Sequence, residues 1–169
     1  MRNYILVKMN SYYFNDEIST ETVNNLVEKL QSFEGGINLW FSTNGGESTS
    51  MAFLINYFNS IKDRLTITLL DKVWSAGTFL LTDYYGKIRI EHNEMDSFLF
   101  HLGDRRMHLQ SVDRDVESAK ILARQDKEFN LIFAEKIKKK GLLTEKQLKK
   151  YLRGYDVLVY KEQFKDWKL

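Results

Sequence analysis

The first two-thirds of the chain alternate between short apolar runs and amphipathic helical patterns, and this alternation constrains the fold more than any other feature. Apolar runs over residues 4–9, 37–42 and 65–70 predict strands. Apolar residues at helical spacing over 21–33 and 48–61 predict the helices between them. Strands that alternate with helices form parallel sheets, because each helix carries the chain back to the start of the next strand. The order therefore predicts an α/β fold with a largely parallel sheet.

The last third is mainly helical, and a chain of 169 residues is expected to form one domain over residues 1–169. Ser19 or Thr20 can cap the first helix, and Thr144 with Gln147 forms a capping box that predicts another. The remaining predicted elements are a helix that begins with 75–81, short strands at 87–90 and 97–101, a long helix over 112–139, a helix to about residue 152, a strand at 157–159 and a final turn over 160–167.

Composition narrows the functional classes. The chain has 25 Lys and Arg against 23 Asp and Glu, a formal net charge of +2, so its charge predicts no nucleic-acid partner. It has no cysteine, which excludes disulfides and thiolate metal sites. No run approaches the ~20 apolar residues of a membrane span. The first apolar run is too short for a signal peptide, so we expect a cytoplasmic protein.

Two turns and one strand end carry the residues that suggest chemistry. Gly45-Gly46 follows the second predicted strand, Ser75 follows the third at the start of a helix, and His101 ends a later apolar strand. The carboxyl ends of parallel strands meet at one edge of the sheet, where ligands of α/β proteins bind. A serine hydroxyl needs an adjacent base to act as a nucleophile, and histidine suits that role.

Backbone N–H groups at these turns could hold an oxyanion. The first N–H groups of a helix have no partner within it, so Ala76 is a candidate donor, and Gly45 or Gly46 can bring a second N–H close to a ligand. Each residue alone has a simpler explanation. A Gly-Gly pair is often only a turn, Ser75 can be a helix cap, and His101 can be a core residue. Their joint arrangement favours a site for acyl transfer.

The same stretches resemble the ClpP family, the proteolytic subunits of the caseinolytic protease. In that family a strand leads into a Ser-Pro-Gly-Gly turn, and a Gly-x-Ala-x-Ser-Met-Gly segment holds the nucleophile. Here Ser42-Thr43-Asn44-Gly45-Gly46 and Asp71-Lys72-Val73-Trp74-Ser75-Ala76-Gly77 match these segments without a gap, and Phe98-Leu99-Phe100-His101 matches the strand that carries the base. The resemblance extends from about Tyr4 to the end of the chain. It implies a ClpP/crotonase-like fold of stacked ββα units with a long helix in the C-terminal half.

The resemblance implies a serine peptidase that hydrolyses peptide bonds in peptides or unfolded proteins, with no cofactor and no metal ion. The implied site residues are Ser75 as nucleophile, His101 as general base, Asp156 as the acid that orients the base, and Gly46 and Ala76 as oxyanion donors.

The resemblance also implies partners. A homo-oligomeric ring is expected, in which the long helix from Val112 packs ring against ring. The family's N-terminal axial segment, which helps to engage an unfoldase ATPase, has no counterpart here, so an unfoldase partner is not expected. The apolar positions of the long helix could instead belong to an ordinary core; they are Ile121, Leu122, Phe129, Ile132 and Phe133.

Several positions depart from the family pattern. Asn44 replaces the proline of the glycine turn, Asp71 replaces a glycine, and Trp74 replaces a small residue beside the nucleophile. Strict alignment puts Tyr155 at the position of the acid, one residue before Asp156. Two alternatives therefore stay open. One is a catalytically impaired homologue that acts as an assembly or binding subunit, and the other is a crotonase-fold enzyme that handles acyl-thioesters without a histidine base.

Overall fold

A computed structural model describes residues 8–102, 112–167 and 169 of the chain. The chain divides into two compact units. The first comprises Met1–Leu99 together with Leu158–Leu169, and the second comprises Phe100–Val157. The first unit contains most of a five-stranded sheet, and the second contains the longest helix.

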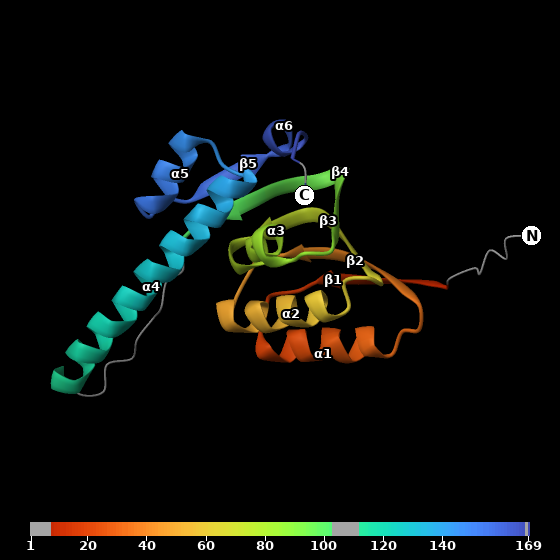
Figure 1. Ribbon diagram of the computed structural model, residues 1–169, viewed down its shortest axis with the longest axis horizontal. Coiled ribbons are helices and arrows are strands. Elements are labelled where there is room, and N and C mark those ends of the chain that lie inside the picture. The colour runs from red at the N-terminus through yellow and green to blue at the C-terminus, as the bar shows by residue number, and fades with distance from the viewer. Residues whose placement is uncertain (1–7, 103–111, 168) are drawn as a thin grey trace, which may run out of the picture. The chain divides into compact units, whose positions relative to one another are not determined.

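The five strands lie in the order β1-β2-β3-β4-β5, so neighbours in the sequence are neighbours in the sheet (Figure 1). The first four strands pair in parallel. This pairing confirms the predicted α/β class with a largely parallel sheet. The strands are β1 (Met9–Asn15), β2 (Gly36–Thr43), β3 (Leu65–Trp74), β4 (Lys87–Phe100) and β5 (Val157–Tyr160).

Helices α1 (Thr20–Gln31) and α2 (Ser48–Ser60) connect the first three strands and contact each other. Because the strand order runs in one direction and such crossovers are right-handed, both helices lie on the same face of the sheet (Figure 1). Alternate strand residues point toward this face and form a buried apolar core with the helices. The core includes Phe14, Leu26, Leu30, Ile37, Leu39, Phe41, Met51, Leu54, Phe58, Ile67 and Leu69.

The starts of two helices follow the local sequence. Of the two predicted caps for α1, the structure selects Ser19: its hydroxyl accepts from the Thr22 backbone N–H at 3.2 Å, and the Ser19 N–H donates to the Thr22 hydroxyl at 3.0 Å. Thr144 and Gln147 form the predicted capping box at the start of α5 (Glu145–Leu152). These reciprocal bonds satisfy backbone donors that a helix cannot satisfy internally.

The strand boundaries differ from the prediction at three places. The predicted strand over 4–9 falls mostly on residues 1–7, which lie outside the described residues, and β1 begins at Met9. β3 continues past Leu70 to Trp74. The two short strands predicted at 87–90 and 97–101 form the single strand β4. β3 and β4 are longer than predicted because they pair with each other through polar residues. Polar residues, taken by their composition alone, indicate turns.

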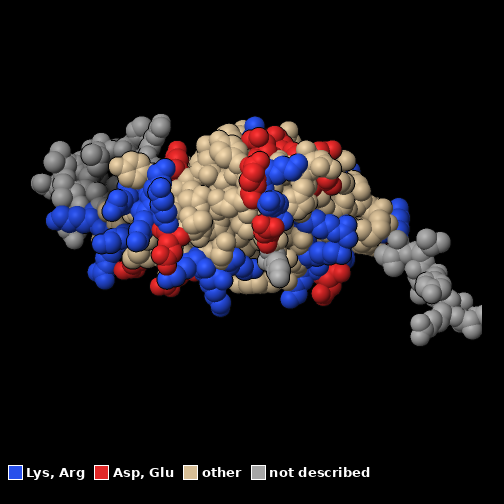
Figure 2. All heavy atoms as spheres, turned by 90° about the horizontal axis from the view of Figure 1, so that it is seen from above, with Lys and Arg blue, Asp and Glu red and all other residues tan. Residues whose placement is uncertain are grey.

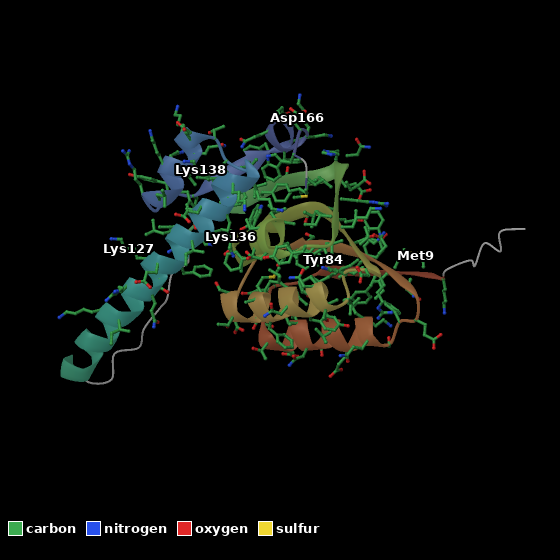
Figure 3. The ribbon with its side chains drawn as sticks, viewed as in Figure 1. Met9, Tyr84, Lys127, Lys136, Lys138 and Asp166 are labelled. Atoms are coloured by element: carbon green, nitrogen blue, oxygen red, sulfur yellow. The ribbon has the colours of Figure 1, made fainter. Side chains whose placement is uncertain are left out.

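The helix predicted from residue 75 is a five-residue 3₁₀ turn, η1 (Ser75–Phe79), followed by the short helix α3 (Leu80–Asp83). Tyr84 ends this segment and is buried. Its ring, labelled in Figure 3, lies on α3's side of α2 and meets the Phe58 ring edge-on at 6.2 Å. Its hydroxyl donates to the Leu65 carbonyl oxygen at 2.9 Å. Burial raises the pKa of Tyr84 to about 12.

The second unit contains α4 (Val112–Lys140), predicted over 112–139, and α5. Gly141 ends α4 in the left-handed conformation (φ 66°). The ring of Phe133 meets that of Tyr151 at 6.3 Å, and both side chains are buried. Three other predicted apolar positions of α4 are not core, because Ile121, Phe129 and Ile132 are 53%, 47% and 56% exposed. The side chain of Leu122 lies outside the described residues.

A short helix, α6 (Lys161–Phe164), follows β5 in the first unit. Basic and acidic side chains are interspersed on the face that Figure 2 shows. Within the described ranges, no helix has both the length and the apolar character needed to cross a membrane.

Candidate active site

Ser75 lies where β3 passes into η1, at the strand-to-helix turn that the sequence predicts. Its backbone is left-handed, with φ at 53°. This conformation costs a residue with a Cβ atom roughly 1–2 kcal/mol. Only strong local constraints keep a serine in it, and residues strained in this way gather at functional sites.

The glycine turn packs directly against Ser75. A Cβ atom added to Gly45 would lie 2.5 Å from the Ser75 Cβ, 3.1 Å from its Oγ and 2.8 Å from the Trp74 carbonyl oxygen. Gly45 also has a positive φ of 94°. The absence of a side chain is therefore required here for two reasons, and the structure brings together the two turns that the sequence analysis singled out.

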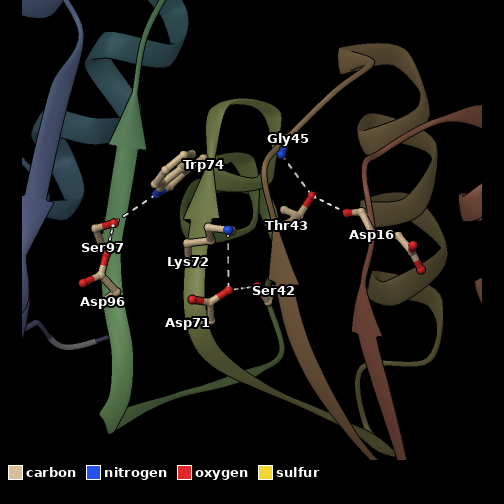
Figure 4. Close-up of polar contacts among 9 residues, drawn as sticks. All are labelled: Asp16, Ser42, Thr43, Gly45, Asp71, Lys72, Trp74, Asp96 and Ser97. Atoms are coloured by element: carbon tan, nitrogen blue, oxygen red, sulfur yellow. Dashed lines mark hydrogen bonds and ion pairs between the residues drawn. The ribbon is translucent and has the colours of Figure 1, made fainter.

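Backbone bonds to Ile18 fix the orientation of this turn. The Ile18 N–H donates to the Gly45 carbonyl at 2.7 Å, and the Glu47 N–H donates to the Ile18 carbonyl at 2.8 Å. In such a parallel bridge the N–H of the central residue, Gly46, points away from the partner strand. The Gly45 N–H is occupied by the Thr43 hydroxyl at 3.0 Å (Figure 4). Within the described residues the Gly46 N–H makes no hydrogen bond, so it is the more suitable donor of the two.

Two contacts fix the start of η1, one with β2 and one within η1 itself. A Cβ atom on Gly77 would lie 2.5 Å from Cγ2 of Thr43, so η1 approaches β2 closely at this point. The Thr78 hydroxyl donates to the Ser75 carbonyl at 2.7 Å. Ala76 is the second residue of η1, so its N–H has no acceptor one turn earlier within the helix.

Asp71 lies at an irregularity in the pairing of β3 with β4 and has a left-handed backbone, with φ at 53°. This conformation explains why glycine suits the position, and aspartate is one of the few other residues that tolerate it. The carboxylate accepts from the Ser42 hydroxyl at 3.2 Å and lies 3.8 Å from the Lys72 ammonium (Figure 4). Its charge is therefore partly compensated on the sheet.

Trp74, the residue before Ser75, extends its indole toward β4. Its Nε1–H donates to the buried Ser97 hydroxyl at 3.0 Å, and that hydroxyl donates to the Asp96 carboxylate at 2.9 Å (Figure 4). The Lys72 ammonium lies 5.4 Å from the centre of the indole ring. The bulky side chain thus has a defined place on the sheet.

His101 and Asp156 lie close together in the second unit. The distance from His101 Nδ1 to Asp156 Oδ1 is 3.8 Å, and the two side chains are 36% and 66% exposed. Tyr155, the residue that strict alignment puts at the position of the acid, is 60% exposed. Of these two residues, Asp156 supplies a carboxylate near the imidazole.

Ser75 and Gly46 belong to the first unit, and His101 and Asp156 belong to the second. Two groups of candidate residues are thus described, one on each unit. The pairing of Ser75 with His101 stays a prediction from the sequence, as do the oxyanion roles.

Sequence reasoning missed two contributors to this region. Ile18 orients the glycine turn through its backbone, and Ser97 receives the Trp74 indole. Neither belongs to a motif. The first bond comes from backbone pairing between distant segments, and the second depends on the register of β4 with β3, in which Lys72 pairs with Ser97.

In the described part of the chain, no group of three or more His, Asp or Glu side chains is placed to hold a metal ion. No protein-family model matches the chain, and no match was found among curated proteins.

Proposed function

We propose that the chain is a ClpP-like serine peptidase in which Ser75 attacks the scissile carbonyl carbon. The left-handed backbone of Ser75, with Gly45 packed against its side chain, carries this proposal. A strained serine on a sharp strand-to-helix turn is typical of hydrolase nucleophiles, because the turn exposes the hydroxyl beside unpaired backbone N–H groups. A serine that served only as a helix cap would be expected to have an extended backbone instead.

The proposed reaction has two halves. As the Ser75 Oγ bonds to the carbonyl carbon, its proton passes to His101 Nε2, and the Gly46 and Ala76 N–H groups stabilise the oxyanion. The carbon–nitrogen bond then breaks, and the departing amine takes the proton from His101. In the second half, His101 takes a proton from a water molecule, which attacks the acyl-enzyme carbonyl carbon. The bond to Ser75 then breaks, His101 returns the proton to the Ser75 Oγ, and the carboxylate product departs.

Asp156 is the proposed orienting acid, and the 3.8 Å approach of its carboxylate to His101 Nδ1 supports this role. That distance exceeds the 2.7–3.2 Å of an ordinary hydrogen bond. Catalytic hydrogen bonds are often long in an unliganded enzyme and shorten when the substrate binds. We propose that the substrates are peptides or unfolded proteins. We also propose that the chain has a ClpP/crotonase-like fold.

Self-association in a ring belongs to the same proposal. The exposed side chains of Ile121, Phe129 and Ile132 on α4 support it, because large apolar side chains gathered on one element often mark an interface.

A catalytically impaired binding subunit is the second candidate. The 66% exposure of Asp156 and the 3.8 Å between its carboxylate and His101 Nδ1 favour it, because a weak contact with the orienting acid lowers the catalytic gain from a histidine base.

Hydrolysis by Ser75→Ala, measured on a panel of peptide esters and unfolded proteins, tests the serine mechanism. Ser60→Ala is the matched control, since Ser60 is an exposed serine at the end of α2. We expect Ser75→Ala to lose hydrolysis and Ser60→Ala to retain it. Equal activity in the wild type and in Ser75→Ala would exclude the mechanism. Hydrolysis of acyl-thioesters that survives His101→Ala would support the crotonase-type alternative.

A further inference from the structure

A pocket between β4 and α6 contains polar side chains that the proposed peptidase reaction does not use. His92 of β4 and Lys161, Glu162 and Lys165 of the α6 segment line a space of about 410 Å³. All four side chains are exposed, and all four belong to the first unit. The pocket therefore has three nitrogen-bearing basic side chains and one carboxylate.

An aromatic cluster beneath the pocket holds its two walls together. The His92 ring stacks on the Phe164 ring at 6.1 Å with an interplanar angle of 22°. Phe164 is fully buried and meets Phe98 of β4 edge-on at 5.1 Å, and Trp167 packs against Phe98 at 4.9 Å. The imidazole of His92 and the α6 segment are thus held in a defined relation before any ligand binds.

Two lysine ammonium groups line this pocket against one carboxylate, that of Glu162. Lys161 and Lys165 both line the pocket, so two like charges border the same space. Within the described residues, no ion pair links Lys161, Lys165, Glu162 or His92 to another side chain. An anion between the two ammonium groups would relieve their repulsion.

We propose that this pocket binds a small molecule that carries a phosphate group. Lysine ammonium groups bind phosphate as point charges, and an imidazole N–H can add a further bond. The volume of about 410 Å³ is larger than one phosphate group needs, so it leaves room for an organic part. The Glu162 carboxylate can accept a hydrogen bond from a hydroxyl group there, which favours a hydroxylated organic phosphate over a simple inorganic anion. This site is independent of the peptidase proposal.

A titration of the full chain with ribose 5-phosphate, followed by ¹H–¹⁵N NMR at constant ionic strength, tests the proposal. We expect saturable shifts centred on His92, Lys161 and Lys165, weaker binding of inorganic phosphate, and no response to ribose or chloride. The double variant Lys161→Gln/Lys165→Gln should bind at least about a hundredfold more weakly, since it loses two charge-assisted bonds, each of which contributes roughly a factor of ten or more. Glutamine keeps a similar helix propensity, so α6 should persist.

Lys146→Gln/Lys149→Gln is the matched control, because it removes the same charge from exposed positions of α5. It should bind ribose 5-phosphate as the wild type does. Lys161→Arg/Lys165→Arg keeps both charges and should also bind. Equal weakening in both glutamine variants, or equal shifts with chloride, would overturn the proposal and indicate only general attraction between the protein and anions.

Discussion

Replacing Gly45 by alanine tests the packing on which the candidate site depends. The added Cβ would lie 2.5 Å from the Ser75 Cβ and 2.8 Å from the Trp74 carbonyl oxygen, in a backbone with φ at 94°. Left-handed strain costs roughly 1–2 kcal/mol, and forced overpacking costs about 1–3 kcal/mol more. We therefore expect Gly45→Ala to lower the free energy of unfolding by about 2–5 kcal/mol, measured by urea denaturation with circular dichroism.

Gly141→Ala separates the cost of the left-handed backbone from the cost of overpacking. Gly141 also has a positive φ, 66°, but a Cβ atom there would meet nothing within 4 Å. Only the backbone term should remain, at about 1–2 kcal/mol. If Ser75 moves to relieve the clash in Gly45→Ala, its reaction with a fluorophosphonate should slow by about a hundredfold, the effect of a misplacement of roughly 1 Å. Equal destabilisation by the two substitutions, with unchanged labelling of Ser75, would refute this reasoning.

Three further substitutions test other contacts. Ser75→Gly should relieve the left-handed strain and raise the free energy of unfolding by up to about 1 kcal/mol. It should also abolish labelling by the fluorophosphonate. An unchanged or lower urea midpoint would argue against strain at Ser75. Tyr84→Phe should cost about 1 kcal/mol at neutral pH by removing the bond to the Leu65 carbonyl. Because burial raises the pKa of Tyr84 to about 12, the wild type should lose stability as the pH rises from about 10 to about 12, and Tyr84→Phe should lack this part of the loss in urea titrations at each pH. Thr144→Ala should cost about 1 kcal/mol by removing a cap, and no change in thermal unfolding would contradict the assigned role of Thr144 with Gln147.

The fold class could be predicted from the sequence because strands and helices differ in the spacing of their apolar residues. The helices began close to their predicted positions where a cap was present, as at Ser19 and Thr144. The strand ends could not be predicted as well. The pairing of Lys72 with Ser97 extends β3 and β4 through polar residues, and pairing between distant segments leaves no local pattern.

The position of the candidate site was predictable in part from the order of strands and helices. Gly45 and Ser75 lie at the ends of adjacent parallel strands, so the topology alone places them at one edge of the sheet. The left-handed backbone of Ser75 was not predictable, because serine rarely adopts this conformation. The bond between Asp71 and Ser42 was not predictable either, because it depends on the irregular pairing of β3 around Asp71. The choice of Asp156 rested on an alignment shift of one residue, and only three-dimensional proximity to His101 bears on it.

Fluorophosphonate labelling of the intact protein, with the modified residue located by peptide mass spectrometry, tests the central proposal most directly. The proposal predicts one covalent adduct per chain, on Ser75, lost in Ser75→Ala and retained in Ser60→Ala. A folded sample that forms no adduct, or that carries it on another serine, would contradict the assignment of Ser75 as the nucleophile.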